Sequence, residues 1–89
     1  METTMKNPVR KLRKQKGLTQ GDLVILLGVS VPFVSQVELG VLAPSETMLQ
    51  NLGNILQIEA EKLGLNLVSF HEKRKEVLEE RLGLRMSRK

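Results

Sequence analysis

Few side chains in this sequence could take part in covalent or metal chemistry. The 89 residues include no Cys and a single His, His71, which lies in a charged segment. A disulfide framework, a thiolate zinc site, a multi-histidine metal site and a serine or cysteine triad are therefore excluded. The carboxylates are scattered without a paired arrangement, and no Gly-rich loop of the phosphate-cradling kind is present. The sequence predicts a protein that is not an enzyme and that holds no metal or cofactor.

The charge of the chain is basic at both ends and acidic in the middle. Lys and Arg number 14 against 10 Asp and Glu, and the sequence pI is near 9.8. Residues 1–40 carry six basic and three acidic side chains (net +3), residues 41–69 one and three (net −2), and residues 70–89 seven and four (net +3). This balance permits an anionic partner without proving one.

Apolar runs are short throughout the chain. The longest, such as LVILL at residues 23–27, fall far below the ~20 residues that span a bilayer, and no signal-like stretch follows Met1. A chain of 89 residues is expected to form one domain. At this size a single hydrophobic core is just large enough to keep the chain folded, so oligomerisation or a tightly bound partner would add stability. We expect an intracellular, cytoplasmic protein without a membrane partner.

The elements that must position any functional residue are short helices. Gly and Pro occur at intervals that suit helices of two to four turns, and the strand signature of alternating β-branched and polar residues is mostly missing. An all-α fold is therefore predicted. The first helix follows Pro8 and ends at Gly17, and the second begins at Thr19, which forms a capping box with Asp22.

Two further helices follow. Ser30 is expected to cap a third helix that tolerates Pro32 in its first turn and ends at Gly40. Ser45 is expected to cap a fourth helix, within which Gly53 costs roughly 1 kcal/mol relative to Ala. The apolar positions predicted to face the core are Val9, Leu12, Leu23, Val24, Leu27, Val34, Val37, Met48, Leu49, Leu52, Ile55 and Leu56.

The C-terminal third is less clearly patterned. A fifth, short helix is predicted at residues 59–63. Residues 63–70 fit two periods, and the helix is favoured. The helical stripe contains Ala60, Leu63, Leu67 and Phe70, and the face of the strand contains Leu63, Leu65 and Leu67. Residues 71–82 have the strong helix formers and charge spacings of a solvated helix, ahead of an end that is expected to fray.

A short helix, a tight turn at Gly28 and a second short helix with a buried β-branched pair form the helix-turn-helix arrangement. The segments VRKLRKQKGLTQGDLVILLGVSVPFVSQVELG at residues 9–40 and PSETMLQNLGNIL at residues 44–56 resemble the Cro/CI-type (Xre) family of bacterial and phage regulators. The match covers about residues 8–63, and the order and spacing of its elements make it specific. It implies a five-helix, lambda-repressor-like bundle that binds operator DNA, usually as a dimeric repressor.

The resemblance also implies an organisation of the chain. Residues 1–7 would be an N-terminal arm, residues 8–63 the helix-turn-helix DNA-binding domain, and residues 64–89 an extension used for dimerisation or as a tail. A roughly palindromic operator is expected for a two-fold dimer.

The resemblance assigns roles to residues around the turn. The third helix would lie in the major groove, while Gln20, with Thr19 beside it at the positive end of the second helix, would bind a phosphate. Arg13 would form an ion pair with Glu38 that locks the first helix to the third; the alternative is that Arg13 lies on a solvated basic face. The residues expected to point toward DNA are Val31, Pro32, Phe33, Ser35 and Gln36.

Val31, Pro32 and Phe33 depart from the family pattern, because polar residues in relatives can bond to bases there. This triplet has no side-chain donor or acceptor. It could contact thymine methyl groups and read DNA shape, leaving hydrogen bonds to Ser35 and Gln36. It could instead be packing residues, with Phe33 folded back onto the domain, or the helix could dock on a protein.

Ile25 and Leu26 are a second departure, because these positions are usually polar in the family. The loop GVLAPS at residues 40–45 also lacks the basic residue that relatives often place near a phosphate. The apolar pair suggests a contact patch for a dimer or a partner protein, or is a pair of surface residues that needs no explanation. Phosphate contacts could be regained from a basic tail, residues 73–89, for which a solvated face is the preferred interpretation. They could also come from Arg10, Lys11, Lys14 and Lys16 on the first helix.

A more limited resemblance points to HipB-like antitoxins, through the pattern GVS..F.S..E and the segment LGLNL. Such proteins repress their own operon and bind a kinase toxin, and their C-terminal strands would favour the strand interpretation of residues 64–70. The competing function is therefore a protein-interaction module that holds a toxin or another regulator through Val31, Phe33, Ile25 and Leu26.

Overall fold

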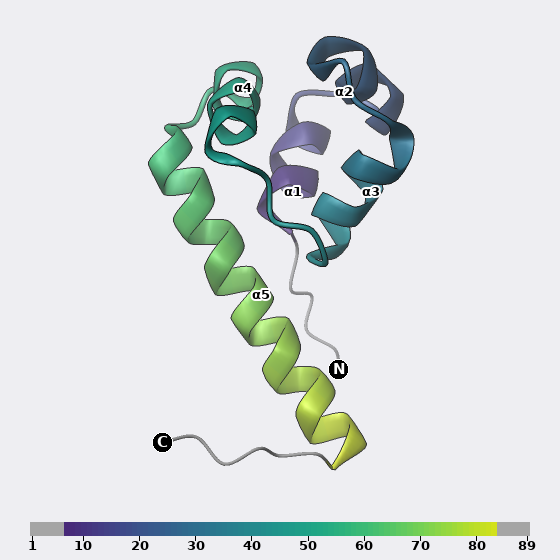
Figure 1. The fold of residues 1–89 in the computed structure, drawn as a ribbon, viewed down its shortest axis with the longest axis vertical. Coiled ribbons are helices and arrows are strands. Elements are labelled where there is room, and N and C mark those ends of the chain that lie inside the picture. Colours follow the sequence, from purple (N-terminus) through teal and green to yellow (C-terminus); the bar gives the residue numbers. More distant parts are fainter. Residues whose placement is uncertain (1–6, 84–89) are drawn as a thin grey trace.

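The computed structural model describes residues 7–83, which fold into five helices (Figure 1). These are α1 (Pro8–Gln15), α2 (Gln20–Leu27), α3 (Val31–Leu39), α4 (Glu46–Leu56) and α5 (Ala60–Leu82). No strand forms within residues 7–83, and the predicted all-α fold is confirmed. Most of the expected N-terminal arm and the end of the basic tail lie outside the described residues.

Side-chain caps fix where the central helices begin. The Thr19 hydroxyl accepts the N–H of Asp22 at 3.0 Å, and the Asp22 carboxylate accepts the N–H of Thr19 at 2.8 Å, so the predicted capping box is confirmed. The hydroxyls of Ser30 and Ser45 each accept the backbone N–H three residues on, at 3.2 Å. The sequence therefore predicts the starts of α2, α3 and α4 correctly.

The core lies where α1 and α4 meet the first half of α5, with α3 packed on α1 and α2 packed on α3. Its fully buried side chains are Val9, Leu23, Val34, Val37, Leu52, Leu56 and Leu63. The first six belong to the inward-facing set predicted for the first four helices, and Leu63 lies on the helical stripe predicted for the C-terminal third. The remaining predicted positions are half-buried and pack against this cluster: Leu12, Val24, Leu27, Met48, Leu49 and Ile55.

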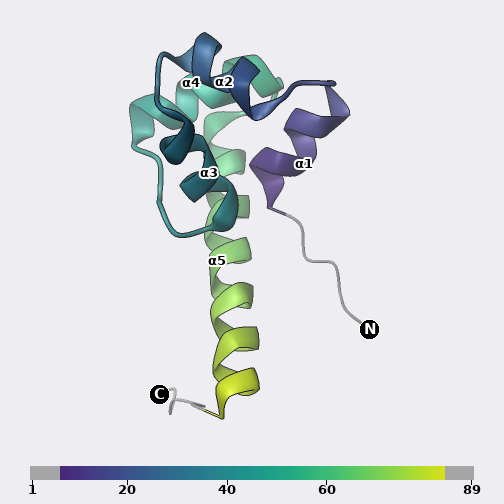
Figure 2. The same cartoon turned by 90° about the vertical axis from the view of Figure 1, so that its right-hand side faces the viewer.

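The structure of α5 differs from the prediction for the C-terminal third of the chain. A single helix of 23 residues replaces the short helix predicted at residues 59–63 and the separate helix at residues 71–82. Leu63 and Phe70 are buried and Leu67 packs against the core between them, a spacing that only a helix places on one face. The strand alternative therefore does not form. The second half of α5 runs past the bundle (Figures 1 and 2).

Gly53 also differs from its expected role as a tolerated glycine. A Cβ on this buried residue would lie 2.5 Å from the backbone oxygen of Ile58 and 3.4 Å from the backbone nitrogen of Ala60. The carbonyl oxygen of Gly53 accepts the N–H of Ile58 at 3.0 Å, so the connection from α4 to α5 folds directly onto this turn of α4. The close approach of backbone requires glycine, and the expectation that Ala would be the better residue is wrong.

Candidate nucleic-acid interface

α2 and α3 form a bent pair around a turn at Gly28. Gly28 has φ 68° and ψ 37°, the left-handed region that glycine adopts without strain, and its N–H donates to the carbonyl of Val24 at 2.9 Å. The chain bends by 117° between the two helices, within the range of helix-turn-helix motifs. By length and composition, no single helix within residues 7–83 could cross a membrane; only this bent pair, taken together, meets those criteria.

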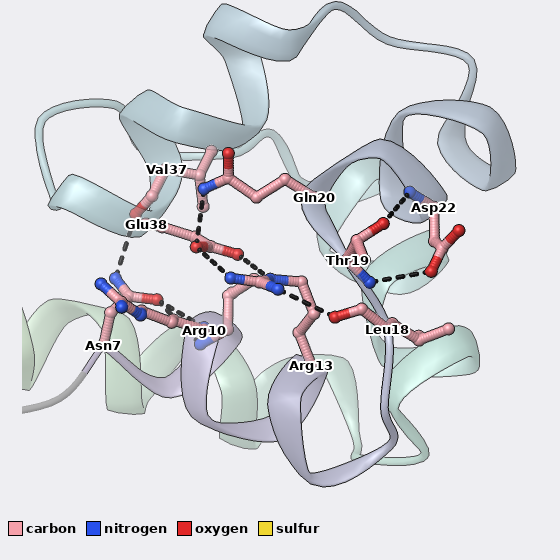
Figure 3. Close-up of polar contacts among 10 residues, drawn as sticks. Asn7, Arg10, Arg13, Leu18, Thr19, Gln20, Asp22, Val37 and Glu38 are labelled. Carbon is pink, nitrogen blue, oxygen red and sulfur yellow. Dashed lines mark hydrogen bonds and ion pairs between the residues drawn. The ribbon is translucent and has the colours of Figure 1, made fainter.

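A buried ion pair joins α1 to α3 (Figure 3). Arg13 Nε donates to Glu38 Oε2 at 2.6 Å and Arg13 Nη2 donates to Glu38 Oε1 at 3.1 Å. The two side chains are only 8% and 4% exposed. The hydrogen bond that Arg13 donates to Glu38 raises the pKa of Arg13 above its ordinary value. Burial opposes this rise, and the charge of Glu38 reinforces it. The geometry is bidentate, which fixes the mutual orientation of the two helices.

The same network reaches the start of α2. Arg13 Nη1 donates to the carbonyl oxygen of Leu18 at 2.8 Å, in the segment that leads into this helix. Gln20 Nε2, on the first residue of α2, donates to Glu38 Oε1 at 3.0 Å. Figure 3 shows these side chains converging from three helices. One carboxylate therefore holds the α2 end, α1 and α3 together.

Asn7 belongs to the same framework and was not recognised from the sequence. It is 3% exposed, and its Oδ1 accepts the N–H groups of Val9 at 2.8 Å and Arg10 at 3.2 Å, which caps α1. Its Nδ2 donates to the carbonyl oxygen of Val37 at 3.0 Å. The pair Asn-Pro, with Asn at an N-cap and Pro at the first helical position, was the available signal for the cap. The hydrogen bond from Asn7 to Val37 joins residues 30 positions apart, so no local sequence pattern predicts it.

The apolar triplet at the start of α3 divides into two groups. Val31 is 54% exposed and Pro32 is also exposed, whereas Phe33 is half-buried and packs against the core. Further along the helix, Gln36 is exposed and Ser35 is half-buried. With Leu39, which is 57% exposed at the end of the helix, the outer surface of α3 presents three apolar side chains and one amide.

The basic residues assigned to this interface are exposed on or just after α1. Arg10 and Lys14 are exposed. Lys16 is also exposed, but its Nζ donates to Gln57 Oε1 at 2.7 Å, at the end of α4. On α2, Ile25 and Leu26 are 79% and 56% exposed, so the outward apolar pair is a feature of the surface.

Comparison with known proteins gives a consistent picture. The helix-turn-helix family model matches residues 9–63, the segment that contains most of α1, all of α2 to α4 and the start of α5. The chain is also similar to the uncharacterised HTH-type transcriptional regulator YazB of Bacillus subtilis, with 36% identity over 55 residues that cover 62% of this chain and 80% of that protein. No solved structure matches the chain significantly. Together with the capped, bent α2–α3 pair, these matches show that the chain belongs to the Cro/CI-type helix-turn-helix family.

Proposed function

We propose that this protein is a sequence-specific DNA-binding transcriptional regulator that acts as a dimeric repressor at a palindromic operator. The observation that carries the proposal is the buried Arg13–Glu38 pair with its bond to Gln20, which holds α2 and α3 in a fixed relation. A rigid α2–α3 pair can present one helix to the major groove while the other crosses the phosphate backbone. The relative in Bacillus subtilis carries the name of a transcriptional regulator, which supports the same function.

The proposed readout combines one hydrogen-bonding residue with apolar contacts. Gln36 is exposed on α3, and a Gln amide can donate and accept at an adenine edge. Val31 and Pro32 would contact thymine methyl groups, and Ser35 is a further candidate at the base edges. Phe33 packs inward and so supports the tip of α3, which leaves Val31 and Pro32 as the apolar residues of the triplet that can contact DNA.

The phosphate contacts proposed for the start of α2 are modified by its side-chain bonds. Gln20 uses one amide hydrogen on Glu38, so its second amide hydrogen is the donor available for a phosphate. Thr19 is paired with the carboxylate of Asp22, whose negative charge opposes an approaching phosphate. Arg10 and Lys14, exposed on α1, are therefore the proposed main source of positive charge.

Selection of bound fragments from random duplex DNA tests this proposal. We expect an enriched palindrome whose half-sites lie about one helical turn, ~34 Å, apart. If each subunit neutralises about three phosphates, the affinity of the dimer should fall with a log-log salt slope of about −5. Failure to enrich any motif at low ionic strength, or a slope near zero, would contradict DNA readout by α3.

The competing function is an antitoxin or other protein-interaction module, and the exposed apolar side chains favour it as the second candidate. Ile25, Leu26 and Val31 are each more than half exposed on α2 and the tip of α3. Under this proposal, Ile25→Glu would abolish capture of a protein partner, and random DNA would give no motif. A kinase-like toxin encoded by a neighbouring gene would support it.

A further inference from the structure

An apolar groove opens between the α3–α4 loop, α4 and the first half of α5. Its volume is 790 Å³, and Val41, Pro44, Leu49, Leu65 and Val68 are among its lining residues. Val41, Leu65 and Val68 are 60% to 69% exposed. This groove, called here the α5 groove, lies at the C-terminal end of α3, away from the helix tip that is proposed to meet DNA. It is therefore open to a different partner.

α5 continues from the α5 groove into a half that its own bundle does not cover. This outer half, residues 71–82, is exposed at nearly every position and projects beyond the other helices (Figure 2). It carries Leu78 and Leu82, which are 40% and 65% exposed. A straight helix keeps Leu82 about 26 Å from Leu65, so the outer half cannot fold back into its own groove.

A single line of residues with coiled-coil spacing connects the two regions. Steps of four and three residues, the 3.5-residue period of a helix seam, place them on one face of α5. His71, near the middle of the line, is anchored because its Nδ1 donates to the carbonyl oxygen of Gly40 at 2.9 Å. The residues of this seam are Gly64, Val68, His71, Lys75, Leu78 and Leu82.

We infer that the outer half of α5 from a second copy of this chain fills the α5 groove, and that the exchange is reciprocal. This inference rests on the homodimer of the proposed function and names its interface. The seam is complementary to itself in the antiparallel sense: Leu82 of one copy meets Gly64 of the other, Leu78 meets Val68, and Lys75 meets His71. All three pairs form in one register, as a two-fold axis requires.

The groove end of this pairing suits a long apolar side chain. Gly64 lies against Leu49 of α4, since a Cβ on it would be 3.3 Å from Leu49 Cδ1, so the partner's Leu82 would contact Leu49 where it meets Gly64. Each copy would then bury its outer leucines against the exposed groove residues Leu65 and Val68. An amphipathic helix in an apolar groove is a recurrent mode of recognition.

Charge favours the same occupant. Glu46 and Glu61 line the α5 groove, and residues 41–69 have one basic and three acidic side chains. The chain that continues after α5 contains Arg85, Arg88 and Lys89 and no acidic residue. The antiparallel pairing brings the end of each α5 to the acidic rim of the other copy, where opposite charges attract.

Disulfide trapping tests the register, because the chain has no Cys of its own. Chains that carry both Val68→Cys and Leu78→Cys should form a covalent dimer on mild oxidation, whereas either single variant should not. Within one chain these positions are about 15 Å apart on the helix, too far for a disulfide. A covalent dimer from Leu78→Cys alone would show that the two Leu78 positions meet, in a parallel pairing or a different antiparallel register, and would overturn the inference.

Sedimentation velocity tests the interface itself. Leu78→Glu should raise the dimer dissociation constant at least about 100-fold, because it places a charge in an apolar contact. Val77→Glu, at the adjacent and equally exposed position of α5 that lies outside the seam, is the matched control and should leave it unchanged. Far-UV circular dichroism checks that both variants remain folded.

The outcomes separate this interface from the proposed function. A wild-type protein that stays monomeric at high concentration but enriches a DNA motif overturns the interface and leaves DNA binding intact. A dimer that persists in Leu78→Glu places the homodimer contact elsewhere and also overturns the inference. Loss of the dimer in Leu78→Glu, with retained binding to a single half-site, supports it.

Discussion

Replacement of Glu38 by Ala should reveal how much the buried ion pair stabilises the fold. The substitution removes the acceptor of two hydrogen bonds from Arg13 and one from Gln20. It leaves a guanidinium whose side chain is only 8% exposed with the Leu18 carbonyl oxygen as its one described acceptor. An unpaired buried charge of this kind costs about 3–5 kcal/mol in the free energy of unfolding. That is a large share of the ~5–15 kcal/mol available to a domain of this size.

Urea unfolding followed by far-UV circular dichroism measures this effect. With an m-value of about 1 kcal/mol/M, the unfolding midpoint should fall by about 3 M or more, and the variant is expected to be partly unfolded without denaturant. Glu38→Gln, which keeps a neutral acceptor, should lose less. Replacing both partners by apolar residues, Arg13→Met with Glu38→Leu, should restore much of the loss.

The pH dependence of this contribution follows from the pKa of Arg13. Pairing raises that pKa in the folded state, so the stabilisation is complete below the pKa of the unfolded chain and is lost only as pH rises through the folded value. The stabilisation by the ion pair is therefore constant across the neutral range.

A different result for Glu38→Ala would refute this view of the network. That result is a loss below 1 kcal/mol in the free energy of unfolding, the size typical of exposed ion pairs.

Three further predictions concern single positions. Gly53→Ala should destabilise the fold by about 1–3 kcal/mol in thermal unfolding, because the added Cβ would lie 2.5 Å from the backbone oxygen of Ile58. Gly21→Ala is the control and should be neutral or stabilising, because its nearest neighbour, Thr19 Oγ1, is 3.6 Å away. Equal effects of the two substitutions would contradict the clash. Asn7→Ala should lose about 2–4 kcal/mol in the same assay. Asn7→Ser keeps a capping oxygen but not the amide donor to Val37, so it should recover only part of this loss, and full recovery would show that the bond to α3 contributes nothing. In fluorescence anisotropy titrations with selected operators, Gln36→Ala should relax base preference at one position, whereas Lys14→Ala should weaken binding to all sequences alike; the reverse pattern would exchange their roles.

Local chemistry explains why the sequence predicts the helices around the turn so well. The capping side chain and the N–H that it binds lie three residues apart, as in Thr19 and Asp22, so the sequence alone contains both partners. Gly28 and Gly40, both at positive φ, likewise mark the ends of α2 and α3 without help from tertiary contacts. Helical periodicity then identifies most of the core.

Contacts between distant residues decide what periodicity leaves open. Leu67 fits a helix or a strand in isolation, and its packing against the bundle makes residues 60–82 one helix. Phe33 turns inward because the core offers it partners, which divides an apolar triplet that looks uniform in sequence. Gly53 is required by a backbone that arrives from the next connection.

The sequence by itself determined the family, the helix starts and the positions of the inward-facing residues, because each depends on neighbours within one or two turns. Only the tertiary structure decided that Asn7 bridges to α3 over 30 residues and that Gln20 shares Glu38 with Arg13. These bonds depend on how helices approach one another in space. Side-chain type and spacing along one helix do not specify that approach, since it follows from the packing of the whole core.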